Sequence, residues 1–270
     1  MKFSTICLSL VLSSFATPVL AQMIVAHRGA SFDAPENTLA AFRLAWEQNA
    51  DGVEGDFYLT KDNQIVCIHD KDTLRTGGKK MIIADSTLED LRSLEYGSWK
   101  DKKFRGEPIP TFAEVLKVIP TGKRFVIELK TGPEIVPFLK EQLDHFKPNS
   151  KDLLIIAFNQ ETVAACKETL PEVTAHWLTG YKQEKKNGSW TPTLNEVVAV
   201  LKKSKADGLG TQGNRDIVTE SFVETLRTHG LREFHVWTVD LPEDASYFKT
   251  LGAMGITTNR PAFIRKHLAN

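Results

Sequence analysis

Two histidines in this sequence stand directly after short apolar runs. His27 follows the run 23–26, and His69 follows the run 64–68. Histidine is the side chain best suited to accept and donate protons near neutral pH. Either histidine alone would more often be a hydrogen-bonded structural residue, but two of them beside other polar groups favour acid–base catalysis. The two histidines therefore indicate a reaction in which one oxygen atom loses a proton and another oxygen atom gains one.

Three carboxylates lie within neighbouring apolar runs. Glu54 and Asp56 are two residues apart in the run 52–59, so on an extended chain both side chains project from one face. Two inward carboxylates repel unless a cation joins them, and Glu128 in another run can supply a third oxygen ligand. An acid pair alone would more often be a surface ion pair. The set of three favours one divalent cation, Ca²⁺ or Mg²⁺, rather than zinc.

Two cationic side chains stand next to these groups. Arg28 carries a rigid fork of donors that matches phosphate oxygens, and Lys130 adds a positive point charge. Both are predicted to contact an anionic phosphate, although Arg28 could instead neutralise Glu54 or Asp56. The remaining histidines lack such neighbours and are expected to be structural: His145, His176, His229, His235 and His267.

Alternating extended runs and amphipathic stretches must position these residues, and this order predicts a parallel sheet covered by helices. The polar residues fall at or near the ends of the runs, which form the active-site face of a (β/α)₈ barrel. Helices are expected after Thr38, and at two capping boxes, Ser86 with Glu89 and Thr111 with Glu114. The predicted extended runs are 23–26, 52–59, 64–68, 124–129, 153–158, 173–178, 206–210, 233–239 and 253–257.

Nine extended runs are one more than an eight-stranded barrel requires. Only Lys61-Asp62-Asn63 separates the second run from the third, which is too short for a crossover helix, so these two runs are predicted to form a hairpin. The following segment, about 71–110, is expected to be a small insertion without a separate core. It would form either a lid or a solvated connection.

Several motifs together resemble the glycerophosphodiester phosphodiesterase family. In chain order they are Ala26-His27-Arg28-Gly29, Pro35-Glu36-Asn37-Thr38, Glu54-Gly55-Asp56, His69-Asp70, Pro110-Thr111, Glu128-Leu129-Lys130 and Val236-Trp237-Thr238. The resemblance implies a (β/α)₈ TIM barrel with His27 and His69 as the acid–base pair. It also implies metal binding by Glu54, Asp56 and Glu128, phosphate binding by Arg28, and a small insertion at about 71–110.

By the same resemblance, a small-molecule glycerophosphodiester is hydrolysed to glycerol 3-phosphate and an alcohol such as choline or ethanolamine. Trp237 would either pack against this substrate or simply fill the barrel mouth. Two positions depart from the family pattern: Gly55 replaces a large apolar residue between the acids, and Asn259 stands where an aspartate is common. Neither departure changes the three acids. The two departures therefore bear on which substrate is cleaved, and not on whether the chain is catalytic.

Two other functions fit parts of the sequence. A phosphodiesterase acting on phospholipids or lysophospholipids would need an apolar rim, for which Trp99 and Phe104 are the candidates. A non-catalytic exported protein that binds a phosphorylated ligand would not need a proton-transfer pair, so the two histidines argue against it.

The first residues predict export. Met1–Ala21 combine Lys2, a short apolar run and a small-residue ending, as in a signal peptide, and the apolar run is shorter than the ~20 residues of a membrane-spanning helix. Residues 22–270 would then be one periplasmic or secreted barrel without a stable membrane anchor. The 34 basic and 34 acidic residues cancel, which gives no general attraction for nucleic acid. The sequence leaves open whether Cys67 and Cys166 pair, and it leaves the oligomeric state open.

Overall fold

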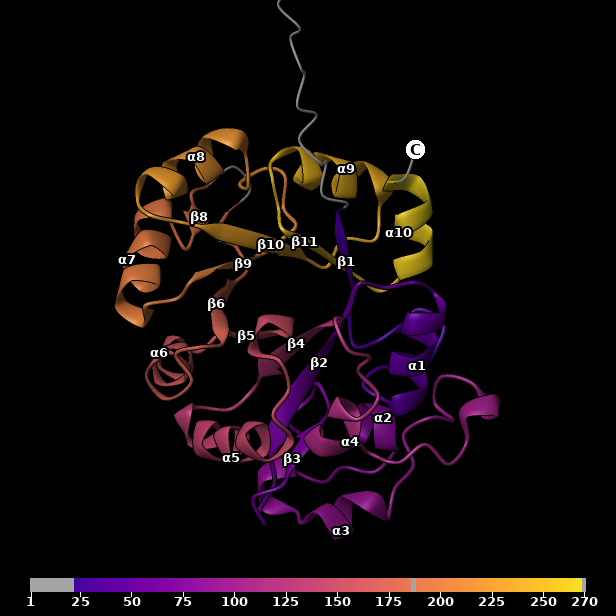
Figure 1. The fold of residues 1–270 in the computed structure, drawn as a ribbon. Helices are drawn as coiled ribbons and strands as arrows, with labels where there is room; N and C mark the ends of the chain where they lie inside the picture. The colour runs from indigo at the N-terminus through magenta and orange to yellow at the C-terminus, as the bar shows by residue number, and fades with distance from the viewer. Residues whose placement is uncertain (1–21, 186–187, 269–270) are drawn as a thin grey trace, which may run out of the picture.

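The computed structural model describes residues 22–185 and 188–268 and contains a closed barrel of eight parallel strands. Strand β1 pairs with both β2 and β11, which closes the sheet (Figure 1). The predicted (β/α)₈ fold is confirmed. The barrel strands in chain order are β1 (Met23–Ala26), β2 (Gly52–Leu59), β4 (Arg124–Leu129), β5 (Leu153–Ala157), β6 (Thr174–Thr179), β9 (Gly208–Gln212), β10 (Glu233–Trp237) and β11 (Gly255–Thr258).

The ninth predicted run is a hairpin partner of β2. Strand β3 (Ile65–Cys67) pairs antiparallel with β2, with Leu59 opposite Ile65, so the predicted hairpin is confirmed. A second small hairpin, β7 (Lys182–Gln183) with β8 (Trp190–Thr191), was not predicted. Strands of two residues are too short to show an alternating pattern.

The helices that follow the barrel strands cover the outside of the sheet (Figure 1). Thr38 caps the first helix by accepting from the amide of Ala41, as expected, and Thr111 with Glu114 forms the predicted capping box. The covering helices are α1 (Leu39–Glu47), α4 (Phe112–Leu116), α5 (Val136–Phe146), α6 (Gln160–Thr169), α7 (Leu194–Ser204), α8 (Glu220–Thr228), α9 (Pro242–Thr250) and α10 (Pro261–Leu268).

The other predicted capping box is wrong by one residue. Helix α3 (Leu88–Arg92) begins after Thr87, and the reciprocal bonds join Thr87 and Asp90. Ser86 instead ends the preceding 3₁₀ turn, η1 (Ile83–Asp85), and its hydroxyl donates to the carbonyl of Ile82. Both pairs have the required spacing, so the sequence alone could not choose between them.

The segment 71–110 has a small core, which the sequence did not predict. Besides α3 and η1 it contains α2 (Leu74–Gly77) and η2 (Lys102–Phe104), and it packs beside β3 (Figure 1). The buried cluster joins Ile83, Leu91, Tyr96 and Ile109 of the segment to Val66 of β3 and to Ile68. A purely solvated connection therefore does not describe this segment.

Three further expectations concern the whole chain. The predicted signal peptide, Met1–Ala21, lies outside the described residues. Among the helices of the described part, none is long and apolar enough to cross a bilayer. Cys67 and Cys166 are both buried and do not form a disulfide with each other.

Candidate active site

The predicted site residues meet at the carboxyl ends of the barrel strands. They surround a cavity of about 140 Å³. One wall is polar, and the other is apolar, with Ile156, Phe158 and Leu178. Of the predicted residues, those that line the cavity are His27, Arg28, Glu54, His69, Glu128, Lys130 and Trp237. Asp56 contacts Arg28 and Lys130 from beside the cavity.

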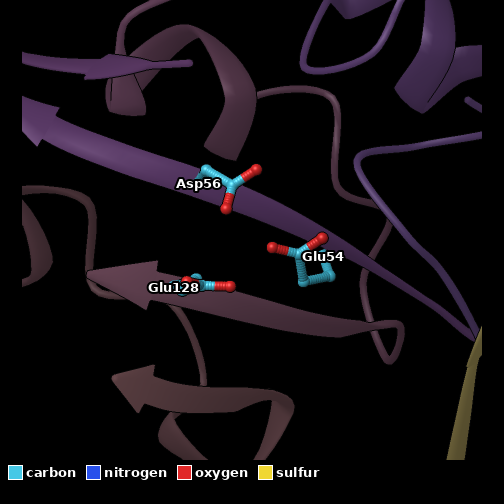
Figure 2. Close-up of side chains that lie close together, drawn as sticks. All are labelled: Glu54, Asp56 and Glu128. Atoms are coloured by element: carbon cyan, nitrogen blue, oxygen red, sulfur yellow. The ribbon is translucent and has the colours of Figure 1, made fainter. Parts of the chain in front are cut away.

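The three carboxylates form one cluster (Figure 2). Glu54 and Asp56 project from the same face of β2, and Glu128 lies opposite Asp56 in the register of β2 and β4. One ligand oxygen from each side chain lies within 4.8 Å of the others, and all three residues are buried. The strand spacing seen in the sequence therefore does bring the predicted ligands together.

The electrostatics of this cluster fit a cation. Burial and the charge of Asp56 raise the pKa of Glu54 well above its usual value, and the same causes raise the pKa of Glu128 to about 7. Burial would also raise the pKa of Asp56, but Lys130 and Arg28 lower it to about 2. Within the described residues, Glu54 Oε1 is buried without a hydrogen-bond partner. A hard divalent cation would satisfy such an oxygen and join the repelling charges.

Arg28 contacts the carboxylates of Glu54 and Asp56. The sequence left open whether Arg28 would neutralise these acids or contact a phosphate. The backbone amide of Arg28 donates to Glu54 at 2.9 Å, and its Nε lies 3.2 Å from Asp56 Oδ2. A terminal guanidinium nitrogen donates to Glu36 at 3.0 Å. Gly29 lies in the turn after β1 with φ at +78°, and a Cβ added there would lie 2.6 Å from the backbone of Ala41. Glycine is needed there to pack the turn against α1.

Lys130 also contacts the carboxylates. Its ammonium group lies 2.7 Å from Glu128 Oε1 and 3.3 Å from Asp56 Oδ1. Burial would lower the pKa of Lys130, but the two carboxylates outweigh burial and raise it. Lys130 is therefore a fixed positive charge at the cavity wall.

The orientation of His27 is set by Asn259. Nδ1 of His27 lies 2.8 Å from Oδ1 of Asn259, whose own amide group donates to Asp240 at 2.6 Å. Because that oxygen can only accept, Nδ1 carries the proton and Nε2 keeps its lone pair, 4.0 Å from Glu54. Burial, followed by the charge of Arg28, lowers the pKa of His27 to about 4. His27 is thus a neutral imidazole with a free acceptor.

The orientation of His69 is set by Asp70 and, through it, by Arg75 of the insertion. Nδ1 of His69 lies 2.7 Å from Asp70, and Asp70 accepts from Nε of Arg75 at 2.7 Å. The terminal nitrogens of Arg75 donate to both oxygens of Glu36, each at 2.8 Å. Since Glu36 also binds Arg28, one guanidinium group connects His69 with Arg28. The sequence motifs contained Asp70 and Glu36, but nothing in their spacing predicted this link.

Trp237 lies at the apolar wall of the cavity. Its ring contacts Phe158 edge to face, with centroids 5.4 Å apart. Its indole nitrogen is buried and has no hydrogen-bond partner among the described residues. The geometry places Trp237 where it could contact a ligand as well as close the barrel.

Two of the other histidines have ionisable neighbours that the sequence did not show. His235 lines the cavity, and His176 lies 3.0 Å behind it, so each has an ionisable neighbour. They belong to strands far apart in the sequence, which is why the chain order did not reveal the pair. The exposed His229 and His267 instead bond to backbone carbonyls four residues earlier.

Comparisons with known proteins agree on one family. Residues 27–263 match the model of the glycerophosphoryl diester phosphodiesterase family. A putative glycerophosphodiester phosphodiesterase of Bacillus subtilis is 36% identical over 245 residues, covering 90% of this chain and 96% of the relative. A glycerophosphodiester phosphodiesterase of Caldanaerobacter subterraneus is 34% identical over 243 residues, covering 88% and 94%.

Solved structures show the same similarity. A phosphodiesterase of Oleispira antarctica, in complex with the product sn-glycerol-3-phosphate, superposes with a TM-score of 0.79 at 25% identity, covering 93% of this chain and 98% of that one. A glycerophosphodiester phosphodiesterase of Thermotoga maritima superposes with a TM-score of 0.70 at 27% identity, covering 91% and 97%.

Proposed function

Because the chain belongs to the glycerophosphoryl diester phosphodiesterase family and is thus a phosphoric diester hydrolase, we propose that it hydrolyses glycerophosphodiesters with one divalent cation and two catalytic histidines. Glycerophosphocholine and glycerophosphoethanolamine are the proposed substrates, and glycerol 3-phosphate is the product. The observation that carries this proposal is the buried carboxylate cluster beside His27 and His69 in one cavity. The Oleispira relative binds that same product.

Glu54, Asp56 and Glu128 would hold the cation. An all-carboxylate set favours Ca²⁺ or Mg²⁺ over softer metals. When bound, the cation polarises a phosphoryl oxygen and stabilises negative charge on it. The cation would also neutralise the carboxylates that form ion pairs with Arg28 and Lys130. Both side chains would then be freer to contact the phosphate.

His27 is the proposed base. Its Nε2 lone pair is directed by the bond from Nδ1 to Asn259, and its lowered pKa keeps the ring neutral. We propose that Nε2 takes the proton of the substrate's own 2-hydroxyl group, whose oxygen then bonds to phosphorus. The bond from phosphorus to the oxygen of the departing alcohol breaks in the same step. A cyclic phosphate and the free alcohol result.

His69 is the proposed acid. It is about one-third exposed, so it lies where a leaving alcohol can reach solvent, and Asp70 binds its Nδ1. The opposite nitrogen would donate its proton to the departing oxygen, because an alkoxide is a poor leaving group. Water then opens the cyclic phosphate with the two roles exchanged. Rapid-quench experiments should detect this cyclic species, whereas its absence would support direct attack by water.

Trp237 would pack against the carbon atoms of the glycerol. Its position on the apolar cavity wall with Phe158 supports this role. Phe158 is also 48% exposed, which favours a second candidate substrate, a lysophospholipid whose chain would extend past this side chain. Faster hydrolysis of lysophosphatidylcholine than of glycerophosphocholine would support that alternative.

Export remains a proposal from the sequence. Met1–Ala21 would be removed, and residues 22–270 would act in the periplasm or outside the cell as one barrel with its insertion at about 71–110. The test is N-terminal sequencing of protein recovered from the periplasm or medium, which should begin at Gln22. Recovery only from cytoplasm with Met1 retained would contradict export.

The direct test of the enzymatic proposal measures glycerol 3-phosphate released from glycerophosphocholine by chelated protein, before and after Ca²⁺ or Mg²⁺ is added. Release that depends on the added cation supports the proposal. No release with either cation would contradict it.

A further inference from the structure

The large apolar side chains that solvent reaches are gathered at one end of the barrel. In the described residues the exposed ones are Phe32, Leu74, Ile82, Trp99, Phe158 and Leu241. Phe32, Phe158 and Leu241 lie on the loops that follow β1, β5 and β10, at the carboxyl ends of these strands, and the other three lie on the insertion. Single exposed apolar side chains need no explanation, but a set confined to one end of a molecule marks a contact surface.

One loop of the insertion combines such side chains with positive charge. It lies between α3 and α4 (Figure 1) and has the sequence Trp99-Lys100-Asp101-Lys102-Lys103-Phe104-Arg105, with four cations and one acid. The ammonium group of Lys100 lies 5.9 Å from the ring centre of Trp99. That of Lys103 lies 4.9 Å from the ring centre of Phe104. None of the four cations belongs to an ion pair within the described residues, so their charge is not neutralised by a contacting carboxylate.

This basic loop, residues 99–105, is held in a fixed shape. The carboxylate of Glu95 accepts from the amides of Gly97 and Gly106, at 3.1 Å and 3.3 Å, which joins the two ends of the loop. The indole nitrogen of Trp99 donates to the carbonyl of Tyr96 at 2.8 Å, and Tyr96 belongs to the buried core of the insertion. Because the loop is already ordered, presenting its side chains to a partner costs little conformational entropy.

The basic loop adjoins the rim of the catalytic cavity. The ammonium group of Lys100 donates to the carbonyl of Ser31, on the loop after β1, at 2.8 Å. The hydroxyl group of Ser31 donates to Oδ1 of Asn259 at 2.9 Å, and the same oxygen binds His27. A partner that contacts the basic loop therefore lies at the same end of the barrel as the proposed base.

Phe32 and Arg260 extend this surface. The amide of Phe32 donates to the carbonyl of Asn259 at 3.1 Å, and the guanidinium carbon of Arg260 lies 4.5 Å from the centre of the Phe32 ring. Arg260 also belongs to no ion pair within the described residues. The docking patch, defined as residues 99–105 with Phe32 and Arg260, thus presents three aromatic side chains among five cations and one acid.

We propose that the docking patch binds the surface of an anionic lipid bilayer reversibly, with the carboxyl end of the barrel toward the lipid. Aromatic side chains favour the boundary between head groups and acyl chains, while lysine and arginine bind lipid phosphates. The charge of the patch is complementary to such a surface. The inference concerns binding alone and does not depend on the proposed reaction.

The remaining exposed side chains distinguish a bilayer from a nucleic acid. Leu74, Ile82 and Leu241 lie at the same end of the barrel and are aliphatic, so they gain from an apolar phase but cannot stack on bases. A bilayer also has no fixed shape, so side chains on separate loops can contact it together. Tighter binding to DNA than to anionic vesicles would overturn the inference.

The test uses protein that begins at Gln22, which contains the whole closed barrel, because the apolar run within Met1–Ala21 would itself bind lipid. Cosedimentation is measured with vesicles of phosphatidylcholine alone and with vesicles that also contain phosphatidylglycerol. The protein should bind only the anionic vesicles, and added salt should weaken binding. Equal binding to both vesicles, or binding to neither, would overturn the inference.

A pair of matched variants locates the contact. Lys102→Gln with Lys103→Gln should weaken binding to anionic vesicles roughly 10- to 30-fold. Lys202→Gln with Lys203→Gln removes the same charge from the end of α7, which precedes the start of β9 and so lies at the opposite end of the barrel. This control should bind like the wild-type protein. Equal weakening by both variants would show a general charge attraction and overturn the docking patch, and equal Tm values would show that both variants are folded.

Fluorescence tests whether Trp99 enters the lipid. Phosphatidylcholine with brominated chains, included in the anionic vesicles, should quench the wild-type protein. Trp99→Phe keeps an aromatic ring, so it should still bind these vesicles, but most of the quenching should be lost. Quenching that is unchanged in Trp99→Phe would place the lipid contact elsewhere and overturn the inference.

Discussion

Asn259 holds His27 through a hydrogen bond of 2.8 Å between Oδ1 and Nδ1, and Asp240 fixes Asn259 in turn at 2.6 Å. In this chain of three residues, Asn259 lies between the carboxylate of Asp240 and the imidazole of His27. A neutral amide therefore orients His27 without adding a charge that would raise its pKa. The departure from the family pattern at position 259 thus bears on the catalytic group and not only on the substrate pocket.

Exchanging these two residues should move the pH profile. In the double variant Asp240→Asn with Asn259→Asp, the hydrogen bond between them is kept with donor and acceptor reversed, and a negative charge now contacts His27. That charge raises the pKa of His27, so protonation of the base begins at higher pH. The acid limb of kcat/KM should shift to higher pH by about one unit or more. The measurement is the pH dependence of kcat/KM at saturating cation.

The single variant Asn259→Asp serves as the control. It places two carboxylates at hydrogen-bond distance, so it should be less stable in thermal unfolding than the double variant. If the double variant has the wild-type acid limb, the proposed role of His27 as the base is wrong.

The carboxylate cluster should make the chelated protein sensitive to pH. The pKa of Glu128 is raised from 4.5 to about 7 in the folded protein, so folding binds a proton between these values. The resulting stabilisation is complete below about pH 4.5 and is lost as the pH rises through about 7. The Tm of chelated wild-type protein should therefore fall across this window relative to that of Glu128→Gln. Parallel Tm profiles for the two proteins would contradict this account.

Addition of the cation should reverse that trend. Ligand carboxylates must be deprotonated, so cation binding should release protons below about pH 7 and strengthen as the pH rises. Calorimetry in buffers of different ionisation enthalpy measures the protons released. Binding without proton release at pH 6 would argue that Glu128 is not a ligand.

Removal of either proposed catalytic histidine should abolish most of the turnover. General acid–base catalysis contributes about 10²- to 10⁴-fold, so His27→Ala and His69→Ala should each lower kcat by that range. Both should bind the cation like the wild-type protein. His229→Ala, on an exposed helix end, is the matched control and should be fully active. A His69 variant as active as this control would remove His69 from the mechanism.

Arg75 should act through the residues it positions. Arg75→Gln breaks the bonds to Glu36 and Asp70, which orient Arg28 and His69, so kcat should fall about 10-fold with a smaller change in KM. Arg75 is 42% exposed, so stability should change by no more than about 1 kcal/mol. Arg92→Gln, which removes another ion pair of the insertion, is the control and should leave kcat unchanged. Equal effects of both variants on kcat would show that Arg75 acts only through general stability.

The barrel and the carboxylate cluster were predictable because both depend on local patterns. The alternation of extended and amphipathic runs indicated the strands, and the i, i+2 spacing of Glu54 and Asp56 placed both on one face of β2. Glu128 followed from the rule that active-site residues gather at the carboxyl ends of barrel strands.

The contacts that orient these residues were not predictable in the same way. Arg75 reaches Glu36 across 39 positions, and Asn259 reaches His27 across 232, so neither link leaves a local pattern. His176 and His235 were set aside for the same reason, because strand order in the closed barrel, and not chain order, brings them together. The core of the insertion was missed because its apolar residues are scattered over short turns and helices.

The most direct test of the central claim is glycerol 3-phosphate release from glycerophosphocholine by chelated protein, with and without added Ca²⁺ or Mg²⁺, for the wild-type protein and Glu54→Gln. Glu141→Gln, on the exposed side of α5, is the matched control. We predict that the cation restores release for the wild-type protein and for Glu141→Gln, and not for Glu54→Gln. Release by Glu54→Gln at the wild-type rate, or release by chelated wild-type protein, would contradict a cation held by this carboxylate cluster.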